Sequence, residues 1–515
     1  SGSTWDEHAI DAAEHQLKCE VAGAELGAEV RRLVRAIRRD NFSTAGQQVS
    51  EEELTSTVIE LVAAIPVYRA DYRSLSRITS TVIAEMAKRF PSRNNALDLI
   101  AAALLAEGEA KNRFAQVCGA VMAKGVEDTL FYRASRLVAL QEVGGAPGRF
   151  GVGAAEFHLL QQERAQLWPS AMTTLTTHDT KRTEDTRARM IAITEAADEF
   201  AELVRQVVAI VPPPDTSTAH FLFQNVLGVW PADGAVTEAL RERLHLYAVK
   251  AVREAGVHSS WFDSEVGFEQ RILDWVDALL FGPAATMISE FVARIDAAGV
   301  HVSLGRKVLQ LAGAGIPDTY QGQEFMDFSL VDPDNRRFVD YTARHQALKQ
   351  YMHARQTDHF ELRSYLHGAG AADAAGADHP AAHELSGLTG VAADRAKQLI
   401  IREGLHLRRE YADVFLRGEH QAVFAVGEAH GHLIGLARGD AAVSGLSVIA
   451  CATRMPLILA ARGGWGETTV QLPTGKWTDR FTGRAFEGTV RVADLFEVLP
   501  TALLVAQQLT EAGRL

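Results

Sequence analysis

Three short apolar stretches constrain the fold most, because each one is followed directly by a cluster of polar residues. They lie at 115–123, at 171–177 and near 315–317. Short apolar runs with β-forming residues are typical of strands that are buried on both faces of a parallel sheet. Parallel α/β barrels keep their functional side chains at the carboxyl ends of such strands. The pattern therefore predicts an α/β fold with functional groups after each strand.

The region before the first of these strands is expected to be helical. Val30 and Leu33 follow helical spacing, and Ser50 followed by Glu53 forms a capping box that starts a further helix. Alanine is abundant in this region and turn residues are few. We therefore predict one helical domain over residues 1–112.

After the second predicted strand the sequence is first mostly helical and then, near the C-terminus, changes to short strands. Residues 183–310 are expected to be mostly helical with a break at Val211-Pro212-Pro213-Pro214, and another helix is expected at 391–411. Residues 367–380 are mostly Gly, Ala, Asp and His without periodicity, which indicates a linker. After Arg417, short strands separated by Gly, Asp and Pro predict a small antiparallel sandwich.

The net charge and the short apolar runs of the sequence argue against several kinds of partner and location. The net charge is −13, from 52 Lys and Arg against 65 Asp and Glu, which argues against nucleic acid or an anionic membrane as the main partner. No apolar run reaches the length of about 18 residues that a membrane helix needs. The N-terminus has no basic stretch followed by an apolar one, so we expect no signal peptide and a cytoplasmic protein.

Sequence motifs for metals and cofactors are not found. Cys19, Cys118 and Cys451 are far apart and form no CxxC, which favours reduced, buried thiols over a disulfide or a zinc site. The 18 histidines show no metal-ligand spacing. The Gly-rich loop at 144–153 has neither a Walker Lys-Ser/Thr nor a GxGxxG. We therefore expect no metal and no cofactor.

The second predicted strand ends in a His-Asp pair within Thr176-Thr177-His178-Asp179-Thr180-Lys181-Arg182. The pair would lie at the carboxyl end of a parallel sheet, where barrel enzymes keep their active sites. A lone His-Asp is weak evidence, because an aspartate at this position is more often the N-cap of a helix, here one at 183–194. The charged residues from 181 to 189, taken alone, would form a solvated helix face.

Two further polar clusters follow the other predicted strands. The cluster at 122–133 could hydrogen-bond sugar hydroxyls and stack on a sugar ring, or it could be a charged turn with internal salt bridges. Its candidate residues are Lys124, Glu127, Asp128, Tyr132 and Arg133. The cluster at 316–324 with 330–341 could line the same site, or it could be a polar loop stabilised by Asx turns. Its candidate residues are Tyr320, Gln321, Glu324, Asp332 and Arg336.

Taken together, these blocks resemble a known family. The stretches 122–133, 142–150, 176–182, 315–324 and 332–341 occur in the same order in maltooligosyltrehalose synthases, which are enzymes of the α-amylase type. So do three shorter blocks, namely Phe157-His158, Leu227-Gly228-Val229-Trp230-Pro231 and Gly464-Trp465-Gly466-Glu467-Thr468-Thr469. The resemblance runs over essentially the whole chain and is to the C-terminal part of the family.

The resemblance implies an α/β fold that is the C-terminal part of a (β/α)8 TIM barrel, with large helical insertions and a C-terminal antiparallel β-sandwich. Residues 113–123, 171–179 and 314–320 would be barrel strands six, seven and eight. The implied domains are a helical insertion at 1–112, strands six and seven at 113–182, a second helical insertion at 183–305, strand eight with its loop at 306–350, a linker and helix at 351–417, and the β domain at 418–515.

The resemblance also implies a reaction. Enzymes of this family convert the reducing-end α-1,4 linkage of a maltooligosaccharide into an α,α-1,1 linkage by a retaining, intramolecular transglucosylation. Asp179 would be the catalytic carboxylate that holds the reacting ring. The residues that would bind sugar are His178, Lys181, Arg182, Lys124, Glu127, Asp128, Tyr132, Arg133, His158, Tyr320, Gln321, Glu324, Asp332 and Arg336.

The sequence departs from the family at the other catalytic groups. The Gly-x-Arg-x-Asp nucleophile motif, the general-acid Glu after strand five and the Asp-x-x-x-Asn-His motif are not found. Arg69-Ala70-Asp71 and Arg294-Ile295-Asp296 have the Arg-x-Asp spacing but lie in helical regions. Because three strands cannot close a barrel, we expect an N-terminal fragment or subunit to complete it in a nicked, split or truncated enzyme.

Two alternatives remain open. The chain could be part of a maltodextrin hydrolase with the same barrel, in which case the product would be glucose. It could also be a non-catalytic glycan-binding subunit, which the missing carboxylates favour for the isolated chain.

Overall fold

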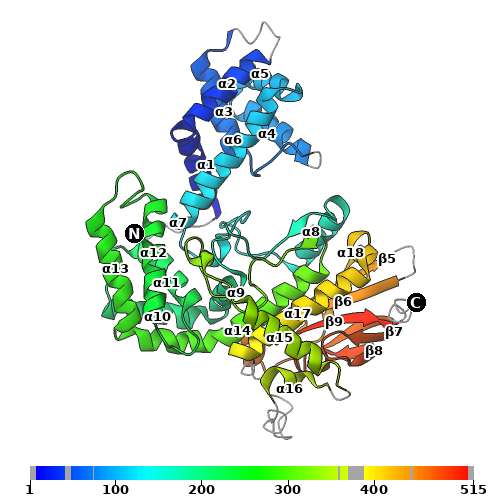
Figure 1. Ribbon diagram of the computed structural model, residues 1–515. Coiled ribbons are helices and arrows are strands. Elements are labelled where there is room, and N and C mark those ends of the chain that lie inside the picture. Colours follow the sequence, from blue (N-terminus) through cyan, green and yellow to red (C-terminus); the bar gives the residue numbers. More distant parts are fainter. Residues whose placement is uncertain are drawn as a thin grey trace. The chain divides into compact units, whose positions relative to one another are not determined.

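The computed structural model describes residues 7–40, 48–72, 75–357, 360–368, 388–440 and 445–507 (Figure 1). The chain forms two compact units. The first consists of residues 1–150, 214–222 and 248–273, and the second of residues 151–213, 223–247 and 274–515. Hydrophobic clusters form a core within each unit.

The first unit begins with a bundle of helices, as the apolar spacing predicted. These are α1 (Glu7–Gly23), α2 (Gly27–Arg39), α3 (Glu51–Ala64), α4 (Ser76–Arg89), α5 (Asn94–Leu105) and α6 (Glu109–Val121). Leu33, Leu54 and Ile100 lie in its core. The Ser50 hydroxyl accepts a hydrogen bond of 3.0 Å from the Glu53 backbone N–H, so the predicted helix start is confirmed.

The strand predicted at 115–123 is wrong, because this segment is helical. Helix α6 continues into the π-helix η4 (Met122–Leu130) and then into α7 (Phe131–Arg133). Phe114, Val117, Cys118 and Val121 are buried at helical spacing against the bundle core. A short apolar run does not distinguish a buried strand from a buried helix, and here helical packing decides. Barrel strand six is therefore not formed by these residues.

The two other predicted strands pair with each other in the second unit. They are β1 (Met172–Thr173) and β2 (Ile316–Pro317), which run parallel with Met172 opposite Ile316 and Thr173 opposite Pro317. Gly315 precedes β2 with a φ of +100°, and a Cβ there would lie 2.6 Å from the Ala171 carbonyl oxygen. The parallel neighbours are confirmed, but both are far shorter than predicted.

Most of the second unit before β2 is helical, as expected. Helices α8 (Ala154–Leu167), α9 (Glu184–Ile193), α10 (Ala197–Ile210) and α14 (Ala284–Ala312) belong to it, and α10 ends just before the predicted proline break. Helices α11 (Thr216–Val229), α12 (Glu238–Ala255) and α13 (Val266–Phe281) contribute residues to both units. Helix α14 packs closely on α9, because a Cβ on Gly299 would lie 2.8 Å from the Arg189 Cα.

The described helices include no single one that is long and apolar enough to cross a membrane. Helices α13 and α14 together have the length and apolar composition of a membrane span, but they are bent by 68° relative to each other. Helix α14 is largely buried in the core of the second unit.

The C-terminal region combines helices with one antiparallel sheet. Its helices are α15 (Tyr341–Ala354), α16 (Leu362–His367), α17 (Gly390–Glu410) and α18 (Ala412–Leu416). Its strands are β3 (Glu419–Val423), β4 (Ala425–Val426), β5 (Leu433–Asp440), β6 (Gly445–Thr453), β7 (Thr469–Asp479), β8 (Ala485–Arg491) and β9 (Thr501–Ala506). The helix predicted at 391–411 is confirmed by α17. The linker predicted at 367–380 lies, from residue 369 on, outside the described residues.

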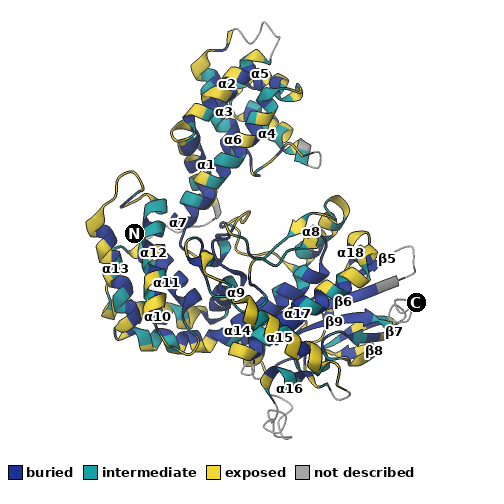
Figure 2. Ribbon diagram, in the orientation of Figure 1, coloured by how far each residue is buried: buried dark blue, intermediate teal, exposed yellow. Residues whose placement is uncertain are grey.

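The strands form one continuous sheet in the order β3-β5-β6-β9-β7-β4, with β8 paired to β7. All its pairs are antiparallel, as predicted, but the described strands do not divide into the two separate sheets of a sandwich. Val448 and Ala450 join the core that contains α14 and α17, whereas Ile449 and Cys451 join a second cluster with Trp477. Both faces of the sheet are thus buried, and Figure 2 shows β9 and the described part of β6 almost entirely in the colour of buried residues.

Candidate functional site

The loop after β1 is fixed by its threonines. The Thr177 hydroxyl oxygen accepts hydrogen bonds from the backbone N–H groups of Asp179 and Thr180, at 3.1 and 3.0 Å. The Thr180 hydroxyl donates back to the Thr177 carbonyl at 3.0 Å. The turn holds His178 and Asp179 in solvent, with side chains 71% and 74% exposed and 3.2 Å between Nε2 and Oδ2. The structure therefore presents an accessible imidazole–carboxylate pair.

Two other predicted segments meet this loop. The backbone N–H of Asp318, just after β2, donates to the Thr173 carbonyl at 2.8 Å. The Tyr320 ring then lies edge-on to the His178 ring, with 6.4 Å between the ring centroids. The Asn335 side-chain amide donates to the His178 carbonyl at 2.9 Å. The segments that the sequence analysis placed at the ends of strands seven and eight therefore converge in one place.

Asp179 is not a helix N-cap. Helix α9 begins at Glu184, and the residue before it is Thr183, whose hydroxyl donates to the Asp327 carbonyl at 2.5 Å. The structural alternative for Asp179 is therefore wrong. Its carboxylate caps no helix start and is open to solvent.

The charged residues that follow are buried, which corrects the alternative of a solvated helix face. The Glu184 carboxylate lies 2.9 Å from the Lys307 ammonium and 3.0 Å from the Lys397 ammonium. The Asp185 carboxylate lies 2.6 Å from the Lys397 ammonium. Side chains of all four residues are at most 1% exposed. We call Glu184, Asp185, Lys307 and Lys397 the buried charge network.

Electrostatics in this network favour ionised Glu184. Burial alone raises the pKa of Glu184, but the positive charges of Lys397 and Lys307 outweigh burial and lower it to about 2. Burial has the larger effect on two other members of the network, since it raises the pKa of Asp185 and lowers the pKa of Lys307. The buried charge of Glu184 is tolerated because it has ammonium partners at hydrogen-bond distance.

The buried charge network holds the loops of the candidate site. The Thr176 hydroxyl donates to Glu184 at 3.2 Å, which ties the network to the loop before His178. The Asp327 backbone N–H donates to Asp185 at 2.8 Å, and the Lys397 ammonium donates to the Phe325 carbonyl at 3.3 Å. The loops after β1 and β2 are therefore fixed to helices α14 and α17 by the same four side chains.

Lys181 and Arg182 are placed inside the unit. Both are buried, with exposures of 6% and 2%. The Lys181 carbonyl accepts from the Val331 backbone N–H at 3.0 Å, and the Arg182 guanidinium donates to the Asn225 side chain at 2.9 Å. These contacts hold the backbone that carries Asp179, whereas His178 and Asp179 themselves remain accessible.

The remaining candidates of the second unit differ in exposure. Gln321 is exposed, and the half-buried Glu324 lies 3.6 Å from the Arg344 guanidinium. Asp332 forms an ion pair with Arg336, whose side chain is 74% exposed. These residues lie on the loops that lead from β2 to α15.

His158 lies in a different environment. It is buried on α8, and its Nδ1 is 3.2 Å from Nε2 of His420 on β3. The ring of Phe424 packs edge-on against it at 5.4 Å. Burial, together with a smaller contribution from the neighbouring His158, lowers the pKa of His420 to about 4. This arrangement packs α8 against the sheet.

The candidates from 122–133 lie in the first unit, on one helical segment. The Lys124 ammonium pairs with the Asp128 carboxylate one turn later at 2.6 Å, so an internal salt bridge is present, although in a helix and not in a turn. Glu127 is buried and accepts from the Gly144 backbone N–H at 3.2 Å. It also lines a cavity of about 510 Å³ together with Tyr68.

The end of the same segment packs inside the first unit. The Tyr132 ring lies 5.7 Å from the Phe221 ring, and the Arg133 guanidinium donates to the Ala255 carbonyl at 2.6 Å. Both residues therefore help to fix the segment that carries Lys124 and Glu127.

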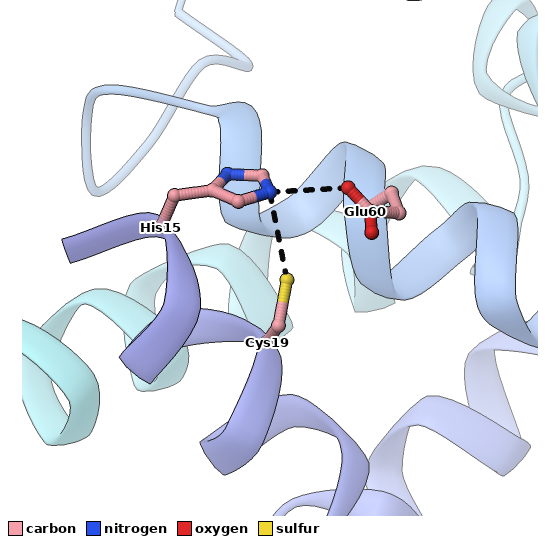
Figure 3. A group of neighbouring side chains, drawn as sticks. All are labelled: His15, Cys19 and Glu60. Carbon is pink, nitrogen blue, oxygen red and sulfur yellow. Dashed lines mark hydrogen bonds and ion pairs between the residues drawn. The ribbon is translucent and has the colours of Figure 1, made fainter. Parts of the chain in front are cut away.

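One group of potential metal ligands was not anticipated from the spacing of the histidines. His15, Cys19 and Glu60 converge in the first unit, with their ligand atoms within 4.8 Å of one another (Figure 3). All three cysteines are free, but Cys19 is half-buried, whereas Cys118 and Cys451 are buried as expected.

Comparison with known proteins identifies the relatives of this chain. Two Mycobacterium tuberculosis proteins, from strains CDC 1551 / Oshkosh and H37Rv, are both described as "Putative maltooligosyl trehalose synthase". Each is 40% identical to this chain over 489 residues, which cover 95% of the chain and 57% of the relative. The chain is homologous to the C-terminal part of maltooligosyltrehalose synthases.

Solved structures agree with this relationship. The structure of maltooligosyltrehalose synthase from Arthrobacter ramosus matches with a TM-score of 0.76 at 37% identity, covering 96% of this chain and 58% of that one. A second maltooligosyl trehalose synthase structure, 22% identical with a TM-score of 0.69, shares the fold. No family model matches the chain. The chain spans little more than half the length of these synthases.

The block at 227–231, which also occurs in maltooligosyltrehalose synthases, accepts hydrogen bonds from a buried arginine of helix α9. The Arg189 guanidinium donates to the carbonyls of Gly228 and Trp230, at 3.1 and 2.7 Å, and to the Asp296 carboxylate at 2.6 Å. Its face lies 3.8 Å from the centre of the Phe328 ring. The block thus anchors helix α9 behind the candidate site.

Sequence reasoning missed the lysines of the buried charge network, although a signal was present. Lys397 lies within the apolar face of its helix, one residue after Ala396 and three before Ile400, both fully buried. Lys307 likewise precedes the buried Val308. A lysine on the apolar face of an amphipathic helix needs a buried partner, because burying an unpaired ammonium group has a large free-energy cost. That rule would have directed attention to Glu184 and Asp185.

Proposed function

We propose that this chain carries part of the active centre for an intramolecular transglucosylation. The reaction converts the reducing-end α-1,4 linkage of a maltooligosaccharide into an α,α-1,1 linkage and gives maltooligosyltrehalose. One observation supports this most. The exposed His178–Asp179 pair follows a parallel strand in a chain that is homologous to maltooligosyltrehalose synthases. The enzyme would be an isomerase that serves trehalose biosynthesis.

In this proposal Asp179 is the catalytic carboxylate supplied by this chain. It accepts hydrogen bonds from hydroxyls of the reacting ring, and its negative charge stabilises the oxocarbenium-like transition state. His178 and Tyr320 contact the same ring, since their own rings lie 6.4 Å apart beside Asp179. Preorganisation by the threonine turn matters because a fixed carboxylate does not have to reorient as charge develops.

The other candidates differ in exposure and in the unit to which they belong. The side chains of Gln321 and Arg336 are accessible and contact more distant sugar rings. Lys181 and Arg182 are buried and act by positioning the loop. Glu324 and Asp332 are the remaining candidates for binding sugar in the second unit. Lys124, Glu127, Asp128, Tyr132 and Arg133 lie in the first unit, and His158 packs α8 against the sheet.

We further propose that the nucleophile and general acid come from an N-terminal fragment or subunit that completes a (β/α)8 barrel. A retaining mechanism needs these two carboxylates about 5–5.5 Å apart. The relatives extend well beyond the region they share with this chain. Met172 on β1 and Ile316 on β2 are 72% and 46% exposed. Such exposure of apolar side chains is expected when the other strands of a parallel sheet come from another fragment.

The test is a product assay with the purified chain, alone and together with the N-terminal part of a relative. The substrate is maltopentaose, and the products are separated by chromatography. The proposal predicts a non-reducing maltooligosyltrehalose from the complex. Free glucose as the main product would instead support a maltodextrin hydrolase, and maltopentaose binding without turnover would support a glycan-binding subunit.

Asp179→Asn is the decisive variant in that complex. It keeps the shape of the side chain but removes the charge, and we expect turnover to fall by about 10²–10³-fold, as when one electrostatic group is removed from other active sites. The control is Asp413→Asn, which changes an aspartate that is 72% exposed on α18. Near-normal turnover of Asp179→Asn, with Asp413→Asn also normal, would refute the catalytic assignment.

A further inference from the structure

Two helices of the first unit bring three different ligand types together. His15 and Cys19 are four residues apart on α1, so they share one face of that helix, and Glu60 faces them from α3 (Figure 3). The His15 Nε2 atom lies 3.1 Å from Glu60 Oε2 and 3.7 Å from Cys19 Sγ. An imidazole, a thiol and a carboxylate thus point at a common centre.

Hydrogen bonding alone accounts poorly for this arrangement. Figure 3 shows that the same nitrogen of His15 makes both contacts. If Nε2 is protonated it donates to the carboxylate, and the Cys19 thiol then cannot donate to it. If Nε2 is unprotonated it accepts from the thiol but directs its lone pair at the carboxylate. A cation at the centre removes this conflict, because nitrogen, sulfur and oxygen then all direct lone pairs at it.

The spacing of the ligand atoms fits a zinc ion. Zinc bonds of about 2.0–2.1 Å to nitrogen and oxygen and about 2.3 Å to sulfur give tetrahedral edges of about 3.3 Å for N–O and about 3.5 Å for S–N. The corresponding separations here are 3.1 and 3.7 Å. The third ligand pair also lies within the 4.8 Å that bounds the whole group. Coordination would therefore need only small side-chain movements.

We propose that His15, Cys19 and Glu60 form a zinc site that joins α1 to α3. A thiolate with an imidazole selects zinc over magnesium or calcium, which prefer all-oxygen ligand sets. The His15 and Glu60 side chains are 39% and 29% exposed, so a water molecule completes the tetrahedron as the fourth ligand.

Binding changes the protonation of one group. Zinc takes the thiolate form of Cys19, so the thiol proton is released to solvent when the Zn–S bond forms. Zinc keeps its oxidation state, and its new bonds to Cys19 Sγ, His15 Nε2 and a Glu60 carboxylate oxygen replace bonds to water molecules of its hydration shell. This site is independent of the proposed transglucosylation, because it uses none of the candidate sugar-binding residues.

The test uses the full chain and zinc or cobalt(II) alone as the probe. Calorimetric titration should show one zinc ion per chain with release of one proton, and cobalt(II) should give a thiolate charge-transfer band with the intense visible bands of a tetrahedral site. His15→Gln and Cys19→Ser should each lose the bound metal at micromolar concentration. The control is His8→Gln, which changes an exposed histidine on the same helix and should leave binding intact.

A second measurement needs no substitution. Cys19 is the half-buried cysteine of the three, so a maleimide should label it in the folded chain much faster than Cys118 or Cys451. Zinc should slow labelling of Cys19 at least tenfold, and a chelator should restore the rate. The proposal is overturned if zinc leaves the labelling rate unchanged, or if His15→Gln and Cys19→Ser bind metal as well as the natural chain.

Discussion

Replacing Lys397 by methionine tests whether the buried charge network stabilises the second unit. Methionine keeps most of the apolar stem and removes the ammonium group, which lies 2.6 Å from Asp185, 3.0 Å from Glu184 and 3.3 Å from the Phe325 carbonyl. Removing one partner of a buried ion pair leaves an uncompensated charge and typically costs about 3–5 kcal/mol. Because Lys397 serves two carboxylates, we expect the loss in free energy of unfolding to lie in that range.

The assay is urea denaturation followed by tryptophan fluorescence, because the described tryptophans report mainly on the second unit. Those in the second unit are Trp168, Trp230, Trp275, Trp465 and Trp477, and Trp261 lies in the first. Lys349→Met is the matched control, since Lys349 is exposed on α15, and it should change stability by no more than about 0.5 kcal/mol.

The effect of Lys397→Met should depend on pH in a defined direction. Burial opposes ionisation of Glu184, but Lys397 and Lys307 outweigh it and lower its pKa from 4.5 to about 2 in the folded chain. A carboxyl with a lowered pKa stabilises the fold above its unfolded pKa, and this contribution is lost as the pH falls through its folded pKa. The difference in free energy of unfolding between the natural chain and Lys397→Met should therefore be largest near neutral pH and become smaller below about pH 4.5. A loss no larger than that of Lys349→Met, or one that stays constant with pH, would refute the reasoning.

Two further predictions concern packing and acid stability. Gly299→Ala places a Cβ 2.8 Å from the Arg189 Cα, so it should force α14 away from α9 and lower the free energy of unfolding by about 1–3 kcal/mol. Gly151→Ala, which meets nothing within 4 Å, should be nearly neutral, and equal stability of the two variants in urea would contradict the packing argument. Burial and the neighbouring His158 lower the pKa of His420 from 6.5 to about 4, so stability should be lost as the pH falls from 6.5 towards 4. His420→Gln removes that proton uptake, and the drop in Tm between about pH 7 and about pH 4.5 should be smaller than in the natural chain; an unchanged drop would show that other groups cause it.

The helices could be predicted from the sequence because their apolar residues recur at helical spacing over many turns. The same approach failed at 115–123, where a run of apolar residues too short to show a period was assigned to a strand. There the buried positions of Val117, Cys118 and Val121 show the helical spacing only once the bundle around them is known. The strands after Arg417 could be predicted from the Gly, Asp and Pro residues that separate them, but whether they form one sheet or two depends on long-range pairing.

The part of the candidate site that lies at the carboxyl ends of the two parallel strands could be predicted from the sequence. The sequence placed His178 and Tyr320 after neighbouring parallel strands, and the structure brings their rings together. The burial of Glu184 and Asp185 could not be read from their own neighbourhood, since acidic residues near a helix start are ordinarily solvated. Their partner Lys397 comes more than two hundred residues later, and no local pattern connects them.

That separation has a consequence for how the chain matures. Lys397 lies 212 residues after Asp185 and pairs with it out of water, so the pair cannot form until helix α17 has been synthesised. A chain emerging from the ribosome at about 5–20 residues per second would hold the Asp185 carboxylate without its lysine partner for roughly ten seconds or more. During that interval the loop that carries His178 and Asp179 has only the Glu184–Lys307 part of its buried anchor. The candidate site would therefore be among the last parts of the second unit to become rigid, and any chain that stops before α17 would lack it.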